Sequence, residues 1–354
     1  MLTPMNTVNL IVSAIISYTT FVTLTCYLTV GTTIAVMNRV PELFLESVFR
    51  VISSMHLVGA GKLQGPTGRV ARSLNATLKL FYLRVSANHD KSQFGFYFLQ
   101  IGDAKDRKAM SYEEVALLNP RNVRITRFDV KMSHSMDYVE WYPIQSLSKF
   151  CDFVVKRQDS CSGYMGNAWS VLATSEIWLI CTIHRLLKNR IYFSAFELFY
   201  IGEESFEHLL HQLDRPYISW LTLKGPWPKK TKSHVKRFMY KKNFRTLDLM
   251  NDGIHFSMSF FDVHNISFFW SSFPEARPFM LRLRDIEIPE KLPEEYTKKT
   301  LYEPIFCYAL RHQSHRNEWL IYDGDAKKKT LTVHSQRCAC PKDCFLNLSY
   351  EINH

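Results

Sequence analysis

Short runs of alternating apolar and polar residues recur through the middle of this chain. Four of them, at residues 196–202, 220–225, 245–251 and 279–285, each predict a short strand that buries two side chains on one face. The stretches between these runs have apolar residues at helical spacing. Leucine-rich repeats typically consist of a strand and a helix that recur about every 20–30 residues. The Asn or Cys ladder position of that repeat is missing in this chain. The pattern predicts an α+β protein with an irregular, leucine-rich-repeat-like β/α array.

Antiparallel strands are expected on both sides of this array. Residues 77–102 contain two β-rich runs around a polar turn and predict a hairpin, and residues 121–133 alternate again. Between them, residues 111–119 predict a helix that begins with a capping box, because Glu114 follows Ser111 by three residues. Toward the C-terminus, three further alternating runs predict a β-meander, at residues 304–312, 318–323 and 329–335.

Residues 41–56 predict one amphipathic helix. The Gly-rich stretch after it, residues 59–69, resembles a phosphate-binding loop at first sight. That motif requires Ser or Thr directly after Gly-Lys and another Gly five residues before the pair's Gly. Leu63 and His56 occupy these two positions. We therefore expect a flexible loop at residues 59–69 and no nucleotide site.

The first 38 residues contain no charged side chain. This run is long enough to cross a hydrocarbon core of about 30 Å, and it predicts an N-terminal hydrophobic helix that spans the membrane once. The alternatives are a buried hydrophobic helix, or an extension that does not belong to the folded protein. Basic residues begin at Arg39, so the positive-inside rule places the body in the cytosol. If translation begins at Met37 instead, a cytoplasmic protein is expected.

The chain divides into four predicted regions. They are a hydrophobic segment at 1–38, an F-box-like helix with a small α+β unit at 39–140, a helical region with β/α repeats at 141–300, and a β-meander with a Cys-containing tail at 301–354. In the third region, the apolar stretch 169–187 predicts a buried helix, because Glu176, His184 and Arg185 interrupt it.

The net charge of +11 is most concentrated at residues 229–245, which carry eight basic residues and no acidic one. If residues 231–242 are helical, Val235, Phe238 and Met239 form a buried stripe and the cations lie outside, as on an outer repeat helix. The candidate partner-binding residues are Lys232, Lys236, Arg237, Lys241 and Lys242. An acidic protein partner and an anionic membrane surface both remain open. Nucleic acid is the least supported partner, because aromatic residues do not alternate with the basic ones.

Candidate chemistry is sparse elsewhere. Four soft ligands at metal-like spacing lie near the C-terminus: His334, Cys338, Cys340 and Cys344. They form one compact cluster rather than two separated pairs, so a tail with free thiols is the stronger interpretation and zinc the weaker one. The sequence contains no nucleophile elbow, zinc-protease motif or kinase motif. We expect no enzyme and no cofactor.

Several phrases resemble the expanded nematode families of F-box-like and F-box-associated proteins. They are "VPELFLESVFRVI" (40–52), "SYEEVALLNPRNVRITRFDV" (111–130), "QLDRPYISWLTLKGPWP" (212–228), "FMYKKNFRTLDL" (238–249) and "EWLIYDGDAKKKTLTVHS" (318–335). The resemblance implies that a helical motif with Pro41, Phe44 and Val48 docks a Skp1-type adaptor. It also implies that the C-terminal repeats or sheets select substrates for ubiquitination. We therefore expect a non-enzymatic protein-interaction module. The alternatives are a membrane-anchored protein with a basic face on the anionic leaflet, and a nucleic-acid-binding protein.

Overall fold

The computed structural model describes residues 41–337, apart from residues 51, 53, 89 and 252 and the segments 102–108, 132–139, 168–173, 275–276, 290–296, 303–304 and 316–317. The predicted hydrophobic helix at 1–38 and the tail beyond residue 337 lie outside the described residues. Within the described ranges, no helix is long and apolar enough to cross a membrane.

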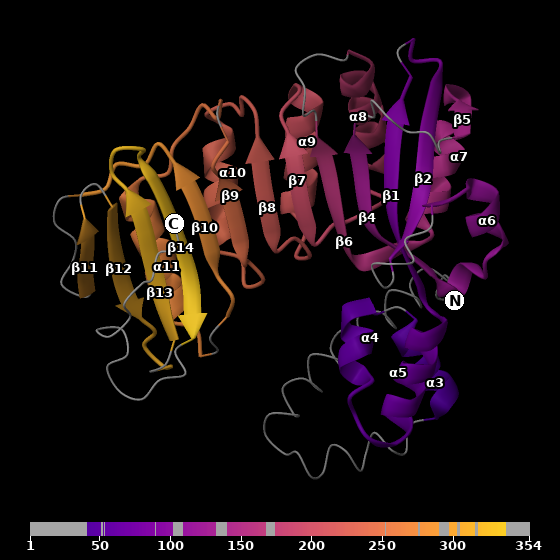
Figure 1. Ribbon diagram of the computed structural model, residues 1–354, viewed down its shortest axis with the longest axis horizontal. Coiled ribbons are helices and arrows are strands. Elements are labelled where there is room, and N and C mark those ends of the chain that lie inside the picture. Colours follow the sequence, from indigo (N-terminus) through magenta and orange to yellow (C-terminus); the bar gives the residue numbers. More distant parts are fainter. Residues whose placement is uncertain are drawn as a thin grey trace, which may run out of the picture.

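One continuous sheet runs through the molecule (Figure 1). The strands of the described part number fourteen: β1 Lys79–Ala87, β2 Gln93–Ile101, β3 Ala109–Met110, β4 Val123–Lys131, β5 Glu140–Pro143, β6 Gln158–Asn167, β7 Ala195–Phe199, β8 Trp220–Lys224, β9 Thr246–Leu249, β10 Met280–Arg284, β11 Thr297–Tyr302, β12 Ile305–Arg311, β13 Glu318–Asp325 and β14 Thr330–Arg337. Their spatial order is β11-β12-β13-β14-β10-β9-β8-β7-β6-β4-β1-β2-β3, and β5 pairs with β2.

The central strands β1, β4, β6, β7, β8, β9 and β10 are parallel and follow chain order. Helices connect them: α7 Leu147–Val155, α8 Thr174–Leu187, α9 Glu203–Leu213, α10 Thr231–Met239 and α11 Phe260–Ser271. Figure 1 shows that these helices all lie behind the sheet, on one face. The opposite face, called here the open face, has no described helix packed on it.

The main core lies between this helical layer and the sheet. Alternate residues of β7, β8, β9 and β10 point into it and are buried: Phe196, Leu198, Leu221, Leu223, Leu247, Leu249, Leu281 and Leu283. The four predicted strands and the helices between them are therefore confirmed. Because side chains alternate across a strand, the intervening residues must lie on the open face.

Strand β6 was not predicted. Its sequence, "QDSCSGYMGN", has no apolar alternation and contains two glycines, which are poor strand formers. It pairs in parallel with β4 on one side and β7 on the other. Backbone hydrogen bonds to two neighbours thus impose a conformation that the local sequence does not specify.

The N-terminal described residues form three helices rather than one helix and a loop. They are α3 Glu42–Phe49, α4 Ser54–Ala60 and α5 Gly65–Thr77. The predicted single helix at 41–56 and the predicted loop at 59–69 are both wrong. Gly68 explains part of the error, because a Cβ at this residue would lie 1.8 Å from the main-chain oxygen of Leu63. The glycine allows close packing at the α4–α5 turn.

The flanking β units continue the same sheet instead of forming separate layers. The predicted hairpin is β1–β2, and α6 Tyr112–Leu117 begins with the predicted capping box of Ser111 and Glu114. The predicted meander is β12–β13–β14, which joins the parallel array where β14 pairs antiparallel with β10. The coarse α+β class with flanking antiparallel units is confirmed.

Candidate functional site

The helices α3, α4 and α5 form a small unit with a core of its own, called here the helical unit. Leu45, Phe49, Leu57 and Ala71 are buried in this core, which is separate from the main one. Figure 1 shows the unit projecting from the β1 end of the sheet. A separately packed unit at one end of an elongated body is a suitable place for a docking surface.

The predicted adaptor-docking residues lie on α3, with their side chains outside this core. Pro41 precedes the helix and is exposed, Phe44 is 48% exposed, and Val48 is half-buried. Leu43, which the amphipathic pattern of this helix predicted to lie in its apolar stripe, is 80% exposed, and Leu45 and Phe49 are buried instead. Neighbouring apolar side chains that stay in contact with water, on a helix that buries Leu45 and Phe49 in its own core, are a feature of binding surfaces.

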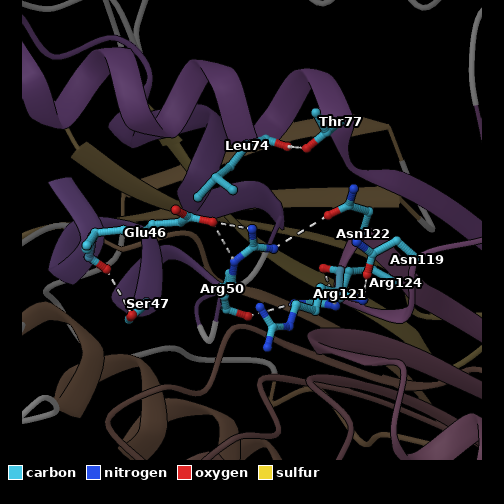
Figure 2. Close-up of polar contacts among 10 residues, drawn as sticks. Glu46, Ser47, Arg50, Leu74, Thr77, Asn119, Arg121, Asn122 and Arg124 are labelled. Atoms are coloured by element: carbon cyan, nitrogen blue, oxygen red, sulfur yellow. Dashed lines mark hydrogen bonds and ion pairs between the residues drawn. The ribbon is translucent and has the colours of Figure 1, made fainter.

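Arginine side chains join the helical unit to the β/α body (Figure 2). Arg50, at the C-terminal end of α3, pairs with Glu46 one turn earlier and donates to Asn122 Oδ1 at 3.5 Å. Arg124 of β4 donates in the opposite direction, from Nη2 to the main-chain oxygen of Arg50 at 2.7 Å. A cation placed against the last carbonyls of a helix also interacts favourably with the helix dipole.

A buried carboxylate provides a second connection. Asp159 Oδ2 of β6 accepts a hydrogen bond from the main-chain N–H of Ser54, the first residue of α4, at 2.9 Å. Burial lowers the pKa of Arg124, and the charge of Asp159 opposes that shift.

Apolar residues of the unit and the arginines line a hollow at this joint. The volume of this hollow in which the centre of a water molecule can lie is about 10 Å³. The hollow can therefore hold one water and is too small for a ligand. The joint is a packed connection, not a binding pocket.

The predicted basic residues lie on and just after α10, and the predicted stripe of Val235, Phe238 and Met239 is buried beneath them. Lys236 Nζ lies 2.5 Å from Asp262 Oδ1 of α11, and Lys232 Nζ lies 3.9 Å from the other oxygen of the same carboxylate.

Two of the remaining basic residues, Arg237 and Lys241, contact the C-terminal end of α9 and the residues just after it. Arg237 pairs with Asp214 at 2.8 Å, and Lys241 donates to the main-chain oxygens of Leu213 and Arg215. Lys242 is exposed. Most of these cations therefore connect α10 and the residues just after it to α11 or to the end of α9, which reduces the charge available to a partner.

The open face carries a set of side chains that the sequence did not identify. Trp220 of β8 is 52% exposed and Met280 of β10 is 39% exposed. Both are paired in register with Thr246 of β9, so all three lie in one row across the strands. Ion pairs flank the row: Lys224 pairs with Glu197, and Arg282 pairs with Asp248 at 2.8 Å. Exposed Trp and Met surrounded by polar groups are typical of protein-binding surfaces.

Aromatic and charged side chains meet at the β1–β4 end of the open face. The guanidinium of Arg84 lies 5.3 Å from the centre of the Tyr82 ring and 5.6 Å from that of Tyr97, and the guanidinium of Arg127 lies 5.0 Å from the Tyr82 ring centre. The Tyr82 hydroxyl donates to the buried carboxylate of Asp129. Burial, followed by this hydrogen bond, raises the pKa of Tyr82 to about 12. The strand alternation could have revealed these groups, but only with the pairing register known.

The proposed metal ligands are only partly placed. His334 lies on β14, with Nδ1 3.7 Å from Asp323 Oδ2 of the neighbouring strand. Cys338, Cys340 and Cys344 lie outside the described residues. Among the residues that the structure describes, no group of three or more His, Cys, Asp and Glu side chains is arranged to hold a metal ion.

Comparison of this chain with family models, curated proteins and solved structures gave no match. No family or fold therefore points to an enzymatic activity.

Proposed function

We propose that this protein is a non-enzymatic protein-interaction protein of the F-box type. In this proposal the helical unit docks a Skp1-type adaptor and the open face of the β/α body binds the protein to be delivered. The observation that carries the proposal is the outward apolar surface of α3. Leu43 and Phe44 are exposed on a small, separately packed helical unit, at the positions where the sequence resembles an F-box motif.

We further propose that the β/α body is a leucine-rich-repeat-like array. Its parallel strands follow chain order and its connecting helices lie on one face. Such arrays present the strand face as an extended binding surface. The row that contains Trp220 and Met280 lies on this face.

Adaptor binding is tested with the full-length chain and a purified Skp1-type adaptor. The wild-type chain should retain the adaptor through size-exclusion chromatography. Phe44→Asp should abolish this association, because it places a charge at the centre of a desolvated apolar contact. Leu117→Asp is the matched control. Leu117 is 87% exposed on α6, which is not part of the helical unit, and the variant should bind as the wild type does. Retained binding by the Phe44 variant would refute this docking mode.

The membrane alternative has less support among the described residues. It requires the cations of α10 to face an anionic leaflet, whereas Lys236 and Arg237 pair with Asp262 and Asp214. The hydrophobic segment on which an anchor would depend lies outside the described residues. A nucleic-acid partner is opposed by the carboxylates of the open face, where Glu197 and Asp248 would repel a continuous line of phosphates.

A further inference from the structure

Helix α11 is the last of the described helices in the layer behind the sheet (Figure 1). It buries Val263 and Ile266 in the main core. On the same helix, however, Phe261 is 70% exposed and Phe268 is 55% exposed. Aromatic side chains on the outer side of a surface helix break the usual division into an apolar and a polar face. Such neighbouring exposed rings are a feature of docking surfaces.

The two exposed rings lie on the flank of α11 that faces away from α10. Asp262 pairs with a lysine of α10, and the ring of Phe269 contacts the tyrosine that follows α10, so these two residues face α10. Successive helical residues differ by about 100°. Val263 and Trp270, which follow these two, are turned toward the core and are buried. The exposed phenylalanines precede them and are therefore turned the opposite way. They are seven residues, or about 10 Å, apart along the helix.

A neighbouring helix would fit on this flank. After β10 the chain adds β11, β12, β13 and β14, and the described residues between these strands form no helix. The place that the next helix of the layer would occupy is therefore beside the exposed phenylalanines of α11.

Helix α11 runs along β13 in the opposite direction. Near the start of the helix, the ring centre of Phe260 is 6.3 Å from that of Tyr322 in β13. Near its end, the ring centre of Trp270 is 4.8 Å from that of His312, whose main-chain N–H donates to the oxygen of Glu318, the first residue of β13. Strand β13 thus continues past the N-terminal end of α11 and into the turn that leads to β14.

That turn carries excess positive charge. Residues 327–329 are three exposed lysines. Asp325 Oδ2 lies 3.6 Å from Lys328 Nζ and balances one of the three charges, and the described residues provide no ion-pair partner for the other two. From Tyr322 to Asp325 the strand rises about 10 Å, which equals about two turns of helix. A helix docked against the exposed rings would therefore reach the lysines about two turns further on.

The exposed area favours a single docked helix over a second folded copy. An aromatic side chain buries roughly 150–250 Å², so the exposed parts of the two rings amount to about 250 Å². A stable interface between folded proteins buries about 800 Å² on each side. An anionic bilayer fits less well, because Lys232 and Lys236, the lysines of α10 that face α11, are held by Asp262.

We propose that the flank of α11 that bears Phe261 and Phe268 binds an amphipathic helix of a partner protein. The partner helix presents two aliphatic side chains, about seven residues apart, to these rings. Acidic side chains about two turns beyond one end of this pair face the lysines of residues 327–329. The surface is separate from the helical unit and from the open face, so the inference does not depend on the proposed function.

The test uses the full-length chain and fluorescein-labelled helical peptides of about 20 residues in an Ala-Gln background. Each peptide carries a pair of leucines about seven residues apart and a cluster of glutamates about two turns beyond one end of the pair. Fluorescence anisotropy should show binding of this acidic peptide. Replacing its leucines by serine, or its glutamates by lysine, should weaken binding about tenfold or more.

Variants of the protein test the same contacts from the other side. Phe268→Ser should weaken the acidic peptide about tenfold or more, and Leu117→Ser, the same loss of exposed apolar area on α6, is its matched control. Reversing Lys327 and Lys329 together to glutamate should weaken the acidic peptide and restore the lysine peptide. Lys149→Glu, at an exposed position on α7, is the control for charge. Urea unfolding of each variant should match the wild type, because all these positions are exposed.

Several results would overturn the inference. They include no binding by any peptide, equal affinity for the acidic and lysine peptides, and unchanged binding by the Phe268 variant. Occupation of the flank by another molecule would do the same. A dimer in analytical ultracentrifugation that is lost in the Phe268 variant would identify a second copy, and sedimentation with phosphatidylserine vesicles that is lost in that variant would identify a membrane. Peptide binding that appears only after the chain is shortened to end at residue 337 would identify the chain's own C-terminal tail.

Discussion

Arg124 of β4 donates a hydrogen bond to the main-chain oxygen of Arg50, 2.7 Å away across the joint between the β/α body and the helical unit. The same side chain also donates to the main-chain oxygen of Val123 at 2.9 Å. The guanidinium therefore fixes the end of α3 relative to the first strands of the sheet. Arg124 is thus one of the residues that set the orientation of the helical unit (Figure 2).

Arg124→Ala should loosen the helical unit while leaving the main core intact. The Arg50 carbonyl loses its charged donor, at a cost of about 1.5–3 kcal/mol for a hydrogen bond to a charged group. Limited proteolysis should then cut between α3 and α4 faster, while cooperative unfolding of the body changes little. Arg245→Ala, at an exposed position just before β9, is the control. Equal proteolysis of the wild type and the Arg124 variant would show that the joint is held by its apolar contacts instead.

A buried histidine pair predicts loss of stability in acid. His184 of α8 and His208 of α9 stack with ring centres 4.4 Å apart, and both are buried. Burial lowers the pKa of His184 to about 3. Burial, followed by the charges of neighbouring His184, His211 and Lys188, lowers that of His208 well below its ordinary value. The folded state therefore keeps both rings neutral.

Proton linkage gives the direction in which the free energy of unfolding changes with pH. The unfolded chain takes up these protons near pH 6.5, so the free energy of unfolding is unaffected by the pair above that pH. It falls as the pH drops further toward 3, with a slope of up to about 1.4 kcal/mol per pH unit for each ring. His208→Leu should reduce the slope in urea unfolding between about pH 6 and 4. His255→Leu, the same replacement at an exposed position, is the control. An unaltered slope in the His208 variant would mean that other groups dominate.

The array was predictable because its signals are local. The buried stripe of Val235, Phe238 and Met239 and the capping box of Ser111 and Glu114 each lie within one turn or two of helix. The open-face row was not predictable, because Trp220 and Met280 come into one row only through their strand pairings with Thr246. The basic segment was misleading for the same reason. The acid that neutralises Lys236 is Asp262, on the next helix.

Gly68 provides a test of the helical unit that the sequence alone would not suggest. The close approach of its Cα to the Leu63 carbonyl leaves no room for a Cβ, so Gly68→Ala should destabilise the unit by about 3 kcal/mol or more. Amide hydrogen exchange in α3–α5 should accelerate, while exchange in the strands of the body stays slow. Gly59→Ala is the matched control, since a Cβ there meets nothing within 4 Å. Replacing Gly59 by alanine should stabilise α4 by about 0.5–1 kcal/mol. Slower exchange in the Gly68 variant would contradict the packing.

Asp262 and Asp214 both neutralise cations of α10, and they should differ in their contribution to stability. Asp262 completes the capping box of α11 with Ser259, and its side chain is only 13% exposed where it faces Lys236 and Lys232. Burial alone would raise the pKa of Asp262, but the hydrogen bonds from Lys236 and Ser259 lower it below its ordinary value.

Asp262→Ala should therefore cost about 1–2 kcal/mol through the lost cap and leave the two lysines without their carboxylate. Asp214→Ala should cost less than about 1 kcal/mol, because its pair with Arg237 is exposed and solvent-screened. Urea unfolding measures the difference. Retention on heparin at rising salt should increase for both variants, because each removes one negative charge beside the basic helix. Equal destabilisation by the two substitutions would show that the cap at Asp262 contributes nothing beyond its charge.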